Sequence, residues 1–198
     1  AGRRAHSHRQ KVCFQCPAGY RSNSERTECR GCTPGQFSTD TVSSDACIKC
    51  DRGRYSTSNQ SSCFPCASGR YGPSINASFC IGCARGRYQP TEAQFSCIEC
   101  VVGRYSNVMN RTLPCDPCVA GTYMSSEGST SCEDCAPGDY SLSGASLCVG
   151  CPAGRRAHSH RQKVCFQCPA GYRSNSERTE CRGCTPGQFS TDTVSSDA

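Results

Sequence analysis

The sequence predicts a small disulfide-rich fold, mostly β or irregular, with short hairpin modules in a linear, solenoid-like array that forms an elongated rod with little or no helix. Three observations support this. All 22 cysteines fall in 11 CxxC pairs whose starts lie 16 to 18 residues apart. A glycine follows every pair, three residues after the second cysteine. A conventional apolar core is out of reach, because the 198 residues include no Trp and only three Leu.

The cysteine content indicates an oxidising compartment. Cysteine makes up 22 of 198 residues, which exceeds the share of about 8–10% that marks a disulfide scaffold. Cytosolic thiols are kept reduced, so we expect a secreted or cell-surface, extracellular protein. No apolar run is long enough to span a membrane, and residues 1–30 lack the apolar core of a signal peptide. We therefore expect a mature segment, with any export signal or anchor outside it.

Each module is expected to be one hairpin, as the stretch CIKCDRGRYS (47–56) illustrates. The glycine allows a sharp turn with positive φ after the disulfide. An aromatic residue then begins a strand, and we expect its ring to lie half exposed over a neighbouring disulfide. Polar tips such as TSNQSS (57–62) separate this strand from a short return strand that leads into the next CxxC pair. The aromatic position holds Phe37, Tyr55, Tyr71, Tyr88, Tyr105, Tyr123, Tyr140 and Phe189.

A longer repeat is superimposed on the modules. Residues 1–46 recur unchanged as residues 153–198, and the seven CxxC pairs of residues 47–152 lie between the copies. The period is therefore 152 residues, or nine modules. Neighbouring modules share little beyond Cys, Gly and the aromatic residue, so identity over 46 residues indicates recent homogenisation or a window cut from a continuing array. We expect the natural protein to be longer than this chain.

Charge does not indicate a nucleic-acid partner. Residues 1–46 hold seven Lys or Arg and four Asp or Glu, while residues 47–152 hold eight of each. The net charge of +6 is thus two copies of +3, and nucleic-acid binding normally needs a denser basic face.

Three pairing schemes are open for the cysteines. First cysteines could join first and second join second across two modules, or two CxxC pairs could hold a zinc ion, or the second cysteine of each pair could join the first of the next. Bridges within single CxxC motifs are a fourth, minor option. One period holds nine CxxC pairs, which is an odd number. A scheme that uses modules two at a time would therefore pair the cysteines of the next period differently. We favour the scheme that joins the second cysteine of each pair to the first cysteine of the next. It joins Cys16–Cys29, Cys32–Cys47, Cys50–Cys63, Cys66–Cys80, Cys83–Cys97, Cys100–Cys115, Cys118–Cys132, Cys135–Cys148, Cys151–Cys165 and Cys168–Cys181, and leaves Cys13 and Cys184 unpaired.

Two kinds of candidate site appear. The stretch GRRAHSHRQK (154–163, and again 2–11) is a candidate anion-binding or lateral contact, strengthened as its histidines charge below about pH 6.5. Three sequons lie in predicted hairpin tips, where a glycan can project into solvent, and the Ser/Thr cluster at 38–44 could carry O-linked sugar. The sequon asparagines are Asn59, Asn76 and Asn110, and the basic residues are Arg155, Arg156, His158, His160, Arg161 and Lys163.

No arrangement of residues indicates catalysis, a metal or a cofactor. The histidines are confined to the basic stretch, neither GxSxG nor HExxH occurs, and the cysteines are assigned to bridges. We therefore expect a protein that is not an enzyme.

The string CxxCxxGxYS at this spacing resembles the ephrin-receptor-like cysteine-rich repeats of extracellular proteins, and looks like the single-bridge module of tumour necrosis factor receptor ectodomains. The resemblance implies structural roles for Cys50, Cys63, Gly53 and Tyr55 and their equivalents, and it carries over no ligand-binding residues. The pattern departs where arginine replaces the aromatic residue, at positions 21, 156 and 173.

Two functions fit these features. The first is an extracellular structural repeat protein that associates with itself to build a glycosylated fibre, filament or stalk, such as a flagellar hair, sheath or surface fibril. The alternative is the cysteine-rich repeat region of a cell-surface receptor or adhesion ectodomain.

Overall fold

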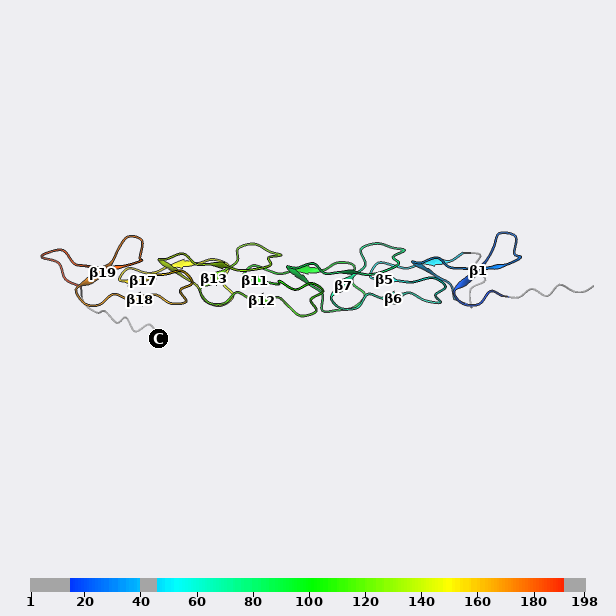
Figure 1. Ribbon diagram of the computed structural model, residues 1–198, viewed down its shortest axis with the longest axis horizontal. Coiled ribbons are helices and arrows are strands. Elements are labelled where there is room, and N and C mark those ends of the chain that lie inside the picture. The colour runs from blue at the N-terminus through cyan, green and yellow to red at the C-terminus, as the bar shows by residue number, and fades with distance from the viewer. Residues whose placement is uncertain (1–14, 40–45, 191–198) are drawn as a thin grey trace, which may run out of the picture. The chain divides into compact units, whose positions relative to one another are not determined.

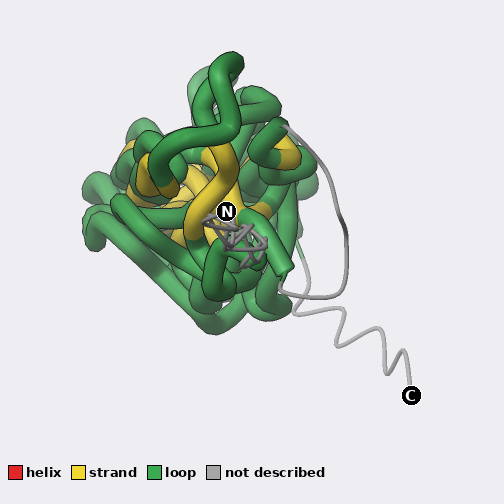
Figure 2. Tube along the Cα trace, turned by 90° about the vertical axis from the view of Figure 1, so that its right-hand side faces the viewer, coloured by secondary structure: helices red, strands yellow, loops and turns green. Residues whose placement is uncertain are grey.

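The computed structural model describes residues 15–39 and 46–190, and it has no helix in these ranges. Its strands are short, drawn as arrows in Figure 1 and as yellow stretches between green loops in Figure 2, and they pair as ten two-stranded antiparallel sheets. The predicted small, disulfide-rich hairpin fold is confirmed. The hairpins are β1 (Tyr20–Ser22) with β2 (Cys29–Gly31), β3 (Gln36–Phe37) with β4 (Ile48–Lys49), β5 (Arg54–Tyr55) with β6 (Phe64–Pro65), β7 (Arg70–Tyr71) with β8 (Ile81–Gly82), β9 (Arg87–Tyr88) with β10 (Ile98–Glu99), β11 (Arg104–Tyr105) with β12 (Asp116–Pro117), β13 (Thr122–Tyr123) with β14 (Glu133–Asp134), β15 (Asp139–Tyr140) with β16 (Val149–Gly150), β17 (Arg155–Arg156) with β18 (Phe166–Gln167), and β19 (Tyr172–Ser174) with β20 (Cys181–Gly183).

The chain divides into two compact units, and both are built from the same kind of hairpin. One unit comprises residues 1–66 and 72–80, and the other comprises residues 67–71 and 81–198. The contacts given below lie within one unit or the other.

A glycine starts every hairpin, as predicted. In the turn before β5, the N–H of Arg54 donates to the carbonyl of Asp51 at 3.2 Å, and Gly53 between them has a φ of +77°. A positive φ at the third residue of a four-residue turn is the signature of a type II turn, which favours glycine. All 11 predicted turn glycines have a positive φ, from +76° to +93°.

The aromatic residues are half-buried on the strand that follows, with the exception of Phe189, which is 85% exposed. The partner that the structure gives the ring is the cross-strand residue between the two cysteines of the next pair. Tyr55 lies opposite Phe64, with ring centroids 6.0 Å apart. Such cross-strand pairs add to hairpin stability where a conventional core is missing.

The buried residues are mainly cysteines and the residues that follow the aromatic positions. The second cysteine of most pairs is fully buried, and Cys66, Cys83 and Cys100 each have 0% exposure. The residue after the aromatic is buried too, as Ser141 is, and its hydroxyl donates to the carbonyl of Thr122 in the preceding hairpin at 2.9 Å. Many of the larger apolar side chains, by contrast, are exposed. Disulfides and backbone hydrogen bonds thus take the place of an aliphatic core.

Consecutive hairpins are joined by a repeated set of backbone hydrogen bonds. The N–H of Gly121 donates to the carbonyl of Ser141 at 2.9 Å, and the N–H of Ser141 donates to the carbonyl of Gln162 at 3.2 Å. The N–H of Arg161, at the tip of hairpin β17/β18, donates to the carbonyl of Cys135 at 3.1 Å. Equivalent bonds recur in both units, so each hairpin is docked on the one before it.

The tips also reach back two hairpins. The carbonyl of Arg161 lies directly over Gly121, so close that an added β-carbon would lie 2.5 Å from the carbonyl carbon. In the other unit the backbone of Asn59 covers Gly19 and that of Asn76 covers Gly35 in the same way. Glycine is therefore needed twice over, for the turn and for the close approach of a later tip.

Candidate functional site

The disulfides bring the cysteines together in the order of the third scheme. Their Cα atoms are 5.5 to 5.8 Å apart, and Cys184 is a free thiol, while Cys13 lies outside the described residues. Within residues 15–39 and 46–190, no three side chains of His, Cys, Asp or Glu gather as metal ligands. The bridged cysteines have no thiol left for zinc or for redox exchange.

The three sequon asparagines occupy the same structural position. Asn59, Asn76 and Asn110 are all exposed at hairpin tips, and all have a positive φ, of 61°, 63° and 55°. Asparagine tolerates this left-handed conformation better than other residues with a β-carbon, apart from aspartate. The same position in other tips holds Ala93, Gly128, Gly144 or Arg161, also at positive φ.

Two of these asparagines have a second contact. The side-chain oxygen of Asn110 lies against Gly82 of β8, and that of Asn59 lies against Gly31 of β2, where a β-carbon would overlap it. Asn76 has no such glycine below it, because the equivalent residue between the cysteines is Lys49. Glycine two hairpins earlier therefore leaves room for the side chain of the tip asparagine at Asn59 and Asn110.

A charged pair occupies the same matched positions elsewhere. The guanidinium Nε of Arg161 lies 3.3 Å from a carboxylate oxygen of Asp134. Sequence reasoning missed this relationship, although one signal was available: the tip residue stands four residues before the next cysteine in Asn59, Asn76, Gly128, Gly144 and Arg161.

The basic stretch 154–163 does not converge on one site. Arg155 and Arg156 are successive residues of β17 and so point to opposite faces. Arg156 takes the aromatic position opposite Phe166, whose ring also contacts the ring of His158 at 5.8 Å between centroids. Arg161 is engaged with Asp134.

Two further residues of this stretch are solvated. His160 and Lys163 are exposed. The first copy of the stretch, residues 2–11, and most of the Ser/Thr cluster at 38–44 lie outside the described residues.

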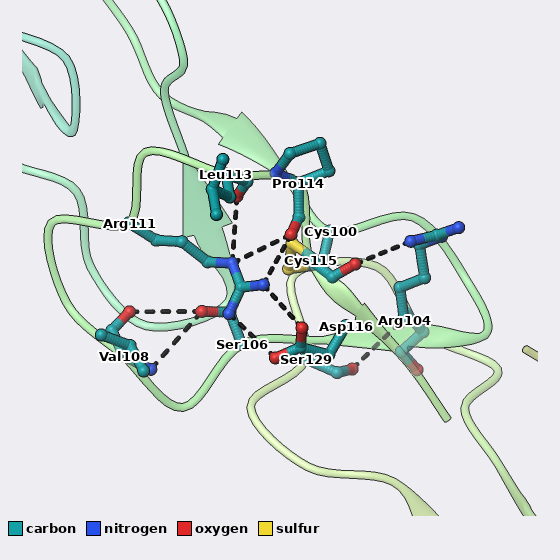
Figure 3. The surroundings of a disulfide bond; sticks show 11 residues. Cys100, Arg104, Ser106, Val108, Arg111, Leu113, Pro114, Cys115, Asp116 and Ser129 are labelled. Carbon is teal, nitrogen blue, oxygen red and sulfur yellow. Dashed lines mark hydrogen bonds and ion pairs between the residues drawn. A yellow bond between two sulfur atoms is a disulfide. The ribbon is translucent and has the colours of Figure 1, made fainter. Parts of the chain in front are cut away.

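An arginine braces the tip of hairpin β11/β12 (Figure 3). The guanidinium of Arg111 donates to the carbonyls of Leu113 and Pro114, each at 3.0 Å from Nε, and grips both carboxylate oxygens of Asp116 at 2.9 and 2.7 Å. The hydrogen bonds from Arg111 and its positive charge lower the pKa of the Asp116 carboxyl below its usual value. Arg111 therefore stabilises the tip of its own hairpin.

The next hairpin places a carboxylate beside a phenol. Tyr123 and Glu133 face each other across β13/β14. The hydrogen bond to Glu133 and its negative charge raise the pKa of the Tyr123 hydroxyl. Both groups are at the surface, and nothing around them forms a catalytic arrangement.

Comparison with known proteins supports the sequence resemblance. Residues 74–110 and 103–141 match the family model described as tyrosine-protein kinase ephrin type A/B receptor-like. Together the matches cover residues 74–141, which include the hairpins from β9 to β14. Search of the curated proteins finds no match to the chain.

No helix in the described ranges is long and apolar enough to cross a membrane. The ten disulfides, together with the receptor-like repeats, indicate an extracellular or cell-surface location.

Proposed function

We propose that this chain, whose residues 74–141 are tandem ephrin-receptor-like repeats, is part of an extracellular structural protein that builds a glycosylated fibre, filament or stalk. One observation carries the proposal. Within each unit, the backbone hydrogen bonds between hairpins join hairpins that are adjacent in the chain, such as Arg161 to Cys135. Contacts of this kind can be continued by further repeats without limit, as in other repeat proteins.

The near-absence of other chemistry supports the same function. The chain repeats residues 1–46 as 153–198 without a change, which favours a protein in which uniform length and surface matter. We propose that Asn59, Asn76 and Asn110 carry N-linked glycans, since each stands exposed at a tip. Their left-handed backbone offers a second reason for asparagine, so occupancy must be measured and not inferred from the sequon alone.

The second candidate is the repeat region of a receptor or adhesion ectodomain. The match to ephrin-receptor-like repeats favours it, because the matched family is named for a receptor. In that case self-association is not required.

Assembly and glycosylation can be tested on one sample. A chain carrying two full periods of 152 residues is secreted from a eukaryotic host and studied by analytical ultracentrifugation, negative-stain electron microscopy and intact mass. We expect concentration-dependent filaments, and a mass above that of the polypeptide which falls after treatment with peptide N-glycosidase.

The matched control is the variant with Asn59→Gln, Asn76→Gln and Asn110→Gln, which should lose the mass excess. A monodisperse monomer at all concentrations would reject the fibre in favour of the ectodomain. A mass equal to that of the bare polypeptide would reject the glycans.

A further inference from the structure

Hairpin β19/β20 places two arginines face to face. Arg173 of β19 and Arg182 of β20 are direct cross-strand partners in an antiparallel pair, and both are exposed. Like charges at directly opposed positions destabilise a hairpin. Among the described residues, no carboxylate lies within 4.0 Å of either guanidinium to offset this. The pair is therefore a candidate for binding an anion from outside the chain.

The two arginines line a hollow of about 520 Å³. A third arginine, Arg178, borders it from the tip of the hairpin, and the remaining polar lining is Ser174, Asn175 and Ser176. The lining therefore offers guanidinium, hydroxyl and amide donors and contains no carboxylate. A guanidinium can bind an oxyanion through two parallel hydrogen bonds, which suits sulfate and phosphate groups.

The backbone around the hollow is fixed before any ligand arrives. The side-chain oxygen of Asn175 accepts the N–H groups of Thr179 at 2.9 Å and Glu180 at 3.2 Å, which closes the tip. The carbonyl of Arg178 accepts the N–H of Ala157 from the preceding hairpin at 2.9 Å. The hydroxyl of Ser174 accepts the N–H of Gly154 at 3.0 Å, and its own proton remains available to a ligand.

The arginine pair and the asparagine that closes the tip occur twice. In the first copy of the duplicated sequence, Arg21 of β1 lies directly opposite Arg30 of β2, and Asn23 closes the tip through the N–H of Thr27 at 2.8 Å. Arg30 there lies 4.0 Å from Glu28, in a pair that is well exposed on both sides and therefore weak. The cross-strand arginine pair thus recurs at an interval of 152 residues.

We propose that these arginine pairs bind sulfate ester groups of an extracellular sulfated polysaccharide. The tetrahedral oxyanion matches the hydrogen-bond donors of a guanidinium pair. Disulfide usage places the chain where such polymers, and not nucleic acids, are the abundant polyanions. The proposal does not depend on the fibre function, and it concerns residues other than the basic stretch 154–163.

The test compares two variants of equal charge. The site variant carries Arg21→Gln, Arg30→Gln, Arg173→Gln and Arg182→Gln, and the control variant carries Lys49→Gln, Arg52→Gln, Arg54→Gln and Arg85→Gln at exposed positions. Binding of a heparin-derived octasaccharide to the full chain is measured by isothermal titration calorimetry at fixed salt. We expect affinity to fall about tenfold or more in the site variant and to change less than about twofold in the control.

Two further measurements separate a sulfate-specific site from unfolding of the variant and from binding to any acidic polysaccharide. The site variant should retain the thermal midpoint of the parent chain, because it removes two like-charged pairs, and a lowered midpoint together with lost binding would overturn the proposal. A hyaluronan oligosaccharide, which has carboxylates and no sulfate, should bind about tenfold more weakly than the heparin fragment, and equal binding of the two would also overturn it.

The remaining outcomes also decide the matter. Equal loss in both variants would show general attraction of a polyanion to a basic chain and would overturn the proposal. Competition by inorganic sulfate or phosphate at the same concentration as the octasaccharide would show a simple oxyanion site and exclude a polysaccharide ligand. Absence of binding by the parent chain would exclude the site itself.

Discussion

Replacing Gly121 by alanine is expected to lower the free energy of unfolding by roughly 2–5 kcal/mol. About 1–2 kcal/mol comes from placing a β-carbon at φ +88°. A further 1–3 kcal/mol, roughly, comes from overpacking, because that carbon would lie 2.5 Å from the carbonyl carbon of Arg161 and 3.0 Å from its Cα. The tip of hairpin β17/β18 must move away, which also strains the bond from Arg161 to Cys135. Chemical denaturation followed by circular dichroism measures the loss.

Gly154→Ala is the matched control. Gly154 has a similar φ of +80°, but no described atom lies within 4 Å of the position of an added β-carbon. Only the backbone strain of about 1–2 kcal/mol should remain. If the two alanine variants unfold with the same free energy, the tip does not press on Gly121 and the contact two hairpins apart is not formed.

Removing the disulfide between Cys118 and Cys132 should be the other large perturbation. The bond closes a loop with a sequence separation of 14, and opening it costs on the order of 3 kcal/mol in the chain-entropy model. Cys118 is fully buried, and its carbonyl accepts the N–H of Gly144 at 2.8 Å and the hydroxyl of Ser143 at 3.1 Å. We therefore expect the variant with Cys118→Ala and Cys132→Ala to loosen hairpin β15/β16 as well as its own.

Limited proteolysis and denaturation together measure this effect. The cleavage sites should include residues 124–131 of the opened hairpin and residues 142–147 of the next tip. The control removes Cys168 and Cys181, whose bond has a separation of 13, and no tip among the described residues is docked on the Cys168 carbonyl. Cleavage confined to the opened hairpin in both variants would contradict the docking of successive hairpins.

Local features of the module could be predicted because each lies within one repeat. Glycine three residues after a cysteine indicated the turn, and the polar tips indicated hairpins without helix. The structure bears out both. The contact of the aromatic ring with a disulfide stays a prediction; the contact that the structure adds is the cross-strand one between the rings of Tyr55 and Phe64. Strand pairing depends on register, and the register was not fixed at the sequence level.

Contacts between hairpins could not be predicted from one sequence. The overlap of the Arg161 tip with Gly121 joins residues 40 positions apart, and nothing local to either indicates it. The sequons at Asn59 and Asn110 were interpreted only as glycan acceptors, although the left-handed backbone and the glycines beneath them also favour asparagine. The basic stretch was interpreted as one surface, but strand alternation separates Arg155 from Arg156.

Hydrogen exchange at the tip amides tests the central claim, that the tips of hairpins β11/β12, β13/β14, β15/β16 and β17/β18 are docked on the preceding hairpin. The N–H groups of Asn110, Gly128, Gly144 and Arg161 donate to the carbonyls of Cys83, Cys100, Cys118 and Cys135 at 2.8 to 3.1 Å. Although they lie in exposed loops, these four amides should exchange at least about 100-fold more slowly than in an unstructured peptide. Exchange at the rate of an unstructured peptide would show that these tips are not hydrogen-bonded to the preceding hairpin and that only the disulfides and the chain connect the hairpins.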